Sequence, residues 1–144
     1  MAGIEAGEVA RPHRVGVIDV RVGAEAEQVP LLRSFAVDIA MRMDFDLDRI
    51  EDLRMTVDEA CSLLVRAALP AASLYCSFTP EAKAIRVNVS VDARSAETPS
   101  SDPMGWQILT ALADSVKEHV ESTADGHRIS IELVALAGGA AEPR

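Results

Sequence analysis

The sequence predicts an α+β two-layer sandwich, in which a mixed, mostly antiparallel sheet is covered on one face by three helices. Two observations support this prediction. Segments in which apolar and polar residues alternate, as in strands, are interspersed with segments in which apolar residues recur every three or four positions, as in helices. Each expected strand also has one apolar and one polar face, which is typical of a sheet with helices on one side only.

The expected elements follow one another as strand, helix, helix, strand, strand, helix and strand. The strands are expected at residues 15–22, 73–78, 84–92 and 127–136, and the helices at residues 25–43, at 46–69, and from 103 or 105 to 120. Residues 93–104 have no periodicity, and a loop of about 12 residues inside a compact domain is usually functional or disordered. Residues 1–13 are expected to form a flexible N-terminal tail and residues 137–144 a C-terminal tail, which leaves 14–136 as a single domain.

The helix at residues 46–69 is expected to be the central element of the domain. Its apolar residues are spaced by three or four positions and form one stripe: Ile50, Leu53, Val57, Ala60, Leu64 and Ala67. Asp46 can cap its start, and Pro70 closes its end. Two adjacent carboxylates, Asp58 and Glu59, lie at its centre. One of the two must border the apolar stripe, where a carboxylate is either solvated or functional.

Composition limits the classes of partner. Fourteen Lys and Arg residues against 23 Asp and Glu residues give a net charge of −9, whereas direct nucleic-acid binding needs a basic surface. The acidic balance is compatible with a basic protein partner, and equally with an ordinary acidic surface. No apolar run approaches the ~20 residues of a membrane span, and the first 14 residues lack the apolar centre of a signal peptide. We therefore expect a cytoplasmic protein that contacts neither membrane nor nucleic acid.

Cysteine and histidine placement predicts no metal site. Cys61 and Cys76 lie within apolar patterns and lack a metal-binding spacing, so we interpret them as reduced core thiols. The three histidines, His13, His119 and His127, are scattered along the chain.

The segments LRMTVDEACSLLVRAAL and MGWQILTALADSVKEH, with two expected strands and a loop between them, resemble the anti-sigma factor kinases of bacterial general-stress and sporulation switches. These proteins have the histidine-kinase-like ATPase fold. The resemblance covers roughly residues 14–135 and is strongest to actinobacterial general-stress anti-sigma factors. It implies the same fold for this chain.

The resemblance also assigns a catalytic position. In that family a helical Glu orients or deprotonates the attacking group, and an Asn four residues later holds the Mg²⁺ that bridges the phosphates. A spacing of four places both side chains on one helical face. Here the Glu position is Glu59, a candidate catalytic residue, but the Asn position is Leu63, which has no oxygen to offer a metal.

Two further motifs of the family bind the nucleotide. The Asp of an Asp-x-Gly-x-Gly motif binds the adenine amino group, and the resemblance assigns this role to Asp92, although Arg94 and Ala96 replace the glycines. A glycine-rich helix start binds phosphate through free amides, and of this motif only Gly105 remains, followed by Trp106.

Each candidate also has a purely structural interpretation. Glu59 is explained equally well as a solvated helix residue paired with Arg66, two turns further on. Asp92 is explained as a residue of the turn after a strand, and Gly105 as a glycine at a helix start. Trp106 is better explained by the core or an interface than by a ligand.

The resemblance implies an anti-sigma factor that sequesters an alternative, stress-response sigma factor and is countered by an anti-anti-sigma protein, with a degenerate nucleotide site. Two alternatives stay open. The first is an active ATP-dependent serine/threonine-protein kinase of the anti-anti-sigma antagonist, with Glu59 as base. The second is an ATP-binding sensor module without a sigma partner. No cofactor is expected under the first interpretation, whereas the alternatives need ATP or ADP with Mg²⁺. The family resemblance further implies a homodimer.

Overall fold

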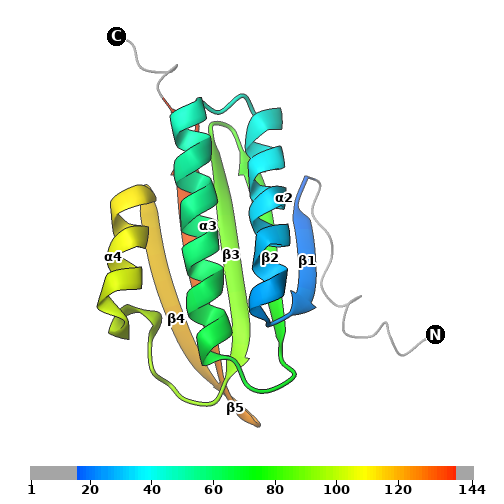
Figure 1. The fold of residues 1–144 in the computed structure, drawn as a ribbon, viewed down its shortest axis with the longest axis vertical. Helices are drawn as coiled ribbons and strands as arrows, with labels where there is room; N and C mark the ends of the chain where they lie inside the picture. Colours follow the sequence, from blue (N-terminus) through cyan, green and yellow to red (C-terminus); the bar gives the residue numbers. More distant parts are fainter. Residues whose placement is uncertain (1–15, 139–144) are drawn as a thin grey trace, which may run out of the picture.

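The structure is a computed structural model that describes residues 16–138. Its elements are, in chain order, β1 (Ile18–Gly23), η1 (Ala26–Gln28), α2 (Val29–Arg42), α3 (Leu47–Ala67), β2 (Ser73–Glu81), β3 (Ala84–Ala93), η2 (Pro99–Ser101), α4 (Pro103–Leu112), β4 (Ser115–Thr123) and β5 (Gly126–Leu136). The expected N-terminal tail, residues 1–13, and most of the expected C-terminal tail lie outside the described residues. The three α-helices cover one face of a five-stranded sheet (Figure 1). The predicted two-layer α+β sandwich is confirmed.

The sheet has the strand order β1-β2-β3-β5-β4, and every neighbouring pair is antiparallel. Along β3 the burial alternates, so that Val87, Val89 and Val91 point toward the helices and are fully buried. Cys61 of α3 and Cys76 of β2 are buried free thiols in the same core. The hydrophobic core therefore lies between the helices and the inner face of the sheet, as the period-2 pattern predicts.

Helix α3 lies over the middle of the sheet and runs along the strands, beside α2 (Figure 1). Its buried positions include Leu53, Val57 and Leu64 of the predicted stripe, each worth roughly 1.5–3 kcal/mol of burial free energy. The N-cap residue is Asp46, as expected, but its side chain makes no capping hydrogen bond to the helix. Within residues 16–138, no helix is long and apolar enough to cross a membrane.

The prediction of the last helix is wrong for its second half. Helix α4 ends at Leu112, not at residue 120, and Ser115–Thr123 forms the edge strand β4. Val116 and Val120 are four residues apart, which places them on one face of a helix and equally on one face of a strand. The backbone becomes extended at Ala113. The amide of Asp114 then donates to the carbonyl of Val134, and the residues that follow pair with β5. Strand pairing resolved an ambiguity that spacing leaves open.

Candidate functional site

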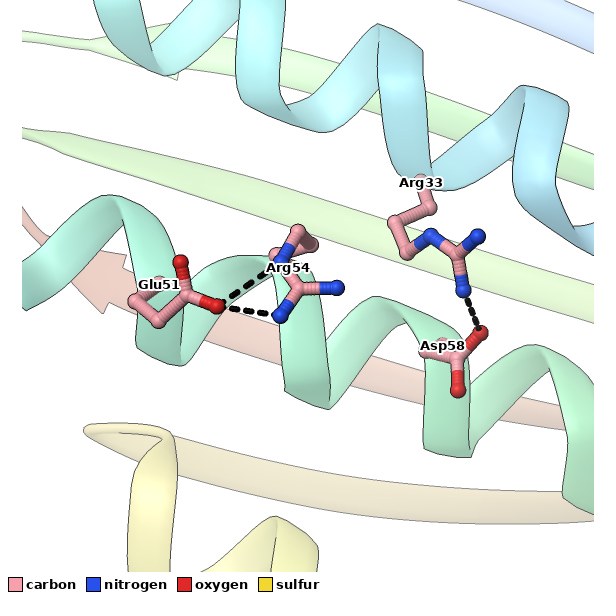
Figure 2. Close-up of polar contacts among 4 residues, drawn as sticks. All are labelled: Arg33, Glu51, Arg54 and Asp58. Carbon is pink, nitrogen blue, oxygen red and sulfur yellow. Dashed lines mark hydrogen bonds and ion pairs between the residues drawn. The ribbon is translucent and has the colours of Figure 1, made fainter.

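The two adjacent carboxylates at the centre of α3 point to different neighbours, because successive residues of a helix are about 100° apart. Asp58 faces α2, where Nη1 of Arg33 donates to its Oδ1 at 2.8 Å (Figure 2). Glu59 faces α4 and is 23% exposed at the side chain. Asp58 therefore joins two helices, and Glu59 is the carboxylate of the candidate site.

The start of α4 packs directly against this face of α3. At Gly105, a Cβ atom would lie 2.6 Å from Oε2 of Glu59 and 2.9 Å from Cδ2 of Leu63. Such distances are shorter than ordinary Cβ contacts, so the lack of a side chain at Gly105 permits the close approach of the two helices. Leu63 is buried, with 6% exposure. The structure thus brings together Glu59 and Gly105, two of the residues that the sequence analysis singled out, with Leu63 beside them.

Arg66 is the cation of this site. Its Nη2 lies 3.7 Å from Oε2 of Glu59 and 3.2 Å from Oδ2 of Asp102, the N-cap residue of α4. The other oxygen of Asp102 accepts a hydrogen bond from the amide of Gly105 at 3.2 Å. The ion pair between Glu59 and Arg66 is the one that the structural interpretation of Glu59 predicts. Asp102 immediately precedes the expected last helix and is not among the candidate residues of the sequence analysis, because its role here depends on a contact with Arg66 across 36 residues.

Asp92 is not part of this cluster. The neighbouring residues Val91 and Ala93 point inward, so Asp92 points to the face of the sheet that the helices do not cover. Its Oδ1 pairs with Nη2 of Arg128 at 3.1 Å, across the β3–β5 register. The guanidinium of Arg128 also lies over the ring of Tyr75, 5.1 Å from its centroid. The sheet therefore separates Asp92 from Glu59 and Gly105.

A cavity of about 250 Å³ lies beside the Arg66 cluster. Its walls come from the last turns of α3, the loop that follows β3, and one residue of β5. The lining residues are Leu63, Leu64, Arg66, Ala67, Arg94, Ser95, Glu97, Thr98, Pro99, Ser101, Asp102 and Ile129. The predicted structureless loop at residues 93–104 thus borders the candidate site, although it contains the last residue of β3, the short helix η2 and the first two residues of α4.

The loop is fixed to the rest of the domain at its other end as well. The amide and the hydroxyl of Ser100 donate to the two carboxylate oxygens of Glu118 in β4, at 2.9 and 2.7 Å. Nη2 of Arg94 donates to the carbonyl of Ala68, just after α3, at 3.4 Å. The loop is therefore held against both α3 and the edge of the sheet.

Comparison with known proteins gives relatives along most of the chain. The anti-sigma-F factors RsbW of Mycobacterium tuberculosis strains CDC 1551 / Oshkosh and ATCC 25618 / H37Rv are each 33% identical to it over 117 residues, which are 81% of this chain and 70% of the relative. The serine-protein kinase RsbW of Bacillus thuringiensis strain Al Hakam is 37% identical over 51 residues, which are 35% of this chain and 32% of that protein. No family model matches the chain. The identity to the mycobacterial proteins extends over more than two thirds of both sequences, and the chain has the two-layer fold that the resemblance implied. This protein therefore belongs to the RsbW family of anti-sigma factors.

Proposed function

We propose that this protein is a cytoplasmic anti-sigma factor that sequesters an alternative, stress-response sigma factor by direct binding. An anti-anti-sigma protein releases the sigma factor by competing for the same anti-sigma factor, in a partner-switching cycle. The observation that supports this most strongly is the match to the mycobacterial anti-sigma-F factors over 81% of the chain. The match to a serine-protein kinase extends over only 35% of the chain, so we do not favour kinase activity.

We further propose that the nucleotide site of the family is degenerate here. Leu63 occupies the position of the metal-binding Asn and has no donor atom, and a guanidinium lies beside the carboxylates of Glu59 and Asp102. Among residues 16–138, no group of three or more His, Cys, Asp or Glu side chains is placed to hold a metal ion. The carboxylate of Asp102 accepts a hydrogen bond from the amide of Gly105 in the first turn of α4, and its negative charge repels a phosphate from these amides. These residues do not fit Mg²⁺ and a nucleotide.

A degenerate site predicts that the protein binds Mg²⁺-ATP more weakly than a Kd on the order of 1 mM. The measurement is isothermal titration calorimetry with ATP, with and without MgCl₂. The matched variant is Leu63→Asn, which restores the missing oxygen, and binding should improve only if the rest of the site still accommodates a nucleotide. Micromolar, Mg²⁺-dependent binding to the wild-type protein would contradict the proposal and favour the kinase alternative.

The segment from residue 38 to residue 52, at the end of α2 and the start of α3, contains six acidic residues and two arginines, and it suits a partner with basic, DNA-binding surfaces. Some of its acidic residues are already paired along their own helix, as Figure 2 shows for Glu51 and Arg54, and as Asp38 is with Arg42. Asp48 is exposed and Asp52 half-buried on the first turns of α3. Complementary charge of this kind accelerates association more than it strengthens the complex.

The association rate with the cognate sigma factor should therefore fall as salt concentration rises. Reversing Asp48 and Asp52 to Lys should slow association by about tenfold at low salt and leave the fold intact. The control reverses Glu121 and Asp125 to Lys, two exposed residues at the far hairpin of the sheet, which changes the net charge by the same amount. Stopped-flow kinetics measures both. Equal effects of the two double variants would show that only net charge matters, and no binding at all would refute the anti-sigma proposal.

We also propose that the protein acts as a homodimer, as the family resemblance implies. Light scattering on the samples used for kinetics should report twice the chain mass of 15.4 kDa. A mass that stays at that of one chain at high concentration would contradict this.

A further inference from the structure

The loop between β3 and α4 is held against α3 by a positively charged side chain, the guanidinium of Arg66. This closing segment, defined as residues 94–102, ends at Asp102, whose carboxylate binds both Arg66 and the amide of Gly105. Glu59 lies on the other side of the same guanidinium nitrogen. We propose that Arg66 serves as a built-in cation between these two carboxylates and keeps the closing segment shut without metal or nucleotide.

Charge is the first reason for this proposal. Gly105 allows α4 to approach within contact distance of Glu59, and Asp102 lies one helical turn before it. Both carboxylate oxygens lie within 4 Å of one nitrogen of Arg66, so without a cation two negative charges would face each other across the junction of α3 and α4. The guanidinium of Arg66 offsets that repulsion.

The position of Arg66 in the helix is the second reason. It lies seven residues after Glu59, two turns along α3, and therefore on the same helical face. Its guanidinium offers several donors, so it can contact one carboxylate of its own helix and one of the next. The other two attachments of the closing segment, Arg94 to Ala68 and Ser100 to Glu118, do not involve these carboxylates. The Arg66 link joins the N-cap residue of α4 directly to α3.

This inference rests on the proposed function, because it explains how a degenerate site keeps the closed geometry. The surface formed by the closing segment and α4 would then be in one conformation whether or not ATP is present. A partner protein that recognises this surface would bind it independently of nucleotide concentration.

The test is hydrogen exchange of the nucleotide-free protein. The side chain of Arg66 is 57% exposed, so its ion pairs are individually weak. In Arg66→Met, amides of the closing segment and the first turn of α4 should exchange about three- to fivefold faster, while those of β3 and β5 stay unchanged. Arg66→Lys retains the charge and should show a smaller increase.

The response of hydrogen exchange to added salt distinguishes a role of Arg66 as a cation from a role in packing. In Arg66→Met the guanidinium no longer lies between Glu59 and Asp102, so the two carboxylates can attract a divalent ion that they do not hold in the wild-type protein. A few millimolar MgCl₂ should therefore slow the exchange of Arg66→Met back toward the wild-type rate, whereas NaCl of equal ionic strength should not. Neither salt should change the wild-type rate. Asp102→Asn retains the helix cap but removes one carboxylate, so it should exchange faster and show no response to MgCl₂.

Unchanged exchange in Arg66→Met, or an equal response to the two salts, would overturn the proposal. If Arg66→Met does not fold, unchanged exchange in Asp102→Asn overturns it just as well. Failure of the proposed function looks different. Calorimetric binding of Mg²⁺-ATP to the wild-type protein would refute the degenerate site, even if the exchange results hold without nucleotide.

Discussion

Leu109→Ala should lower the free energy of unfolding by about 2–5 kcal/mol, the range for truncating a buried leucine. Leu109 is fully buried, and it and Gly105 are the two buried residues of α4. Gly105 has no side chain, so Leu109 is the main apolar anchor of this helix in the core. Its loss leaves a cavity that a ten-residue helix, fixed by β4 on one side and the closing segment on the other, fills only in part.

The matched control for Leu109→Ala is Met104→Ala on the same helix. Met104 is 74% exposed, so its truncation should change stability by less than about 0.5 kcal/mol. Urea denaturation of both variants measures the difference. If the two variants lose the same stability, α4 is not anchored through Leu109, and the packing of α4 against α3 described above is incorrect.

The stability of the protein should fall steeply above pH 9, because two thiols are buried in the core. Burial, and to a smaller extent the nearby carboxylate of Asp58, raises the pKa of Cys61 from its ordinary value of 9.0 to about 12. Burial also raises the pKa of Cys76 well above 9.0. A raised pKa in the folded state means that the stabilising contribution is complete below pH 9 and is lost as the pH rises toward 12. Cys61 should cost about 1.4 kcal/mol of stability per pH unit in that window, and Cys76 acts in the same direction.

The measurement compares urea denaturation at pH 8 and at pH 11. Between these values Cys61 alone should remove about 3 kcal/mol of stability. The double variant Cys61→Ala/Cys76→Ala loses some packing at both pH values, so its change between them isolates the titration of the thiols. That change should be smaller than in the wild-type protein by at least the contribution of Cys61. An identical pH dependence in the two proteins would show that the thiols are not the groups responsible.

The sequence by itself determined the layers and most of the element order. The alternation in residues 84–92 and the apolar stripe of the central helix depend only on spacing along the chain, and both were confirmed as β3 and α3. The family resemblance assigned Glu59 and Gly105 to the motifs of the nucleotide site, and the comparison with the mycobacterial anti-sigma-F factors shows that the family was identified correctly. The close approach of Gly105 to Glu59 is seen only in the structure.

Only the tertiary structure decided the second half of the last helix, because the spacing of Val116 and Val120 suits a strand as well as a helix, and pairing with β5 favoured the strand. It also decided the partner of Asp92, because the ion pair with Arg128 depends on the register between β3 and β5. The ion pair between Arg66 and Asp102 joins residues 36 positions apart. The physical reason is common to all three. Periodicity is a local property of the chain, whereas partners and facing directions are set when distant segments pack against one another.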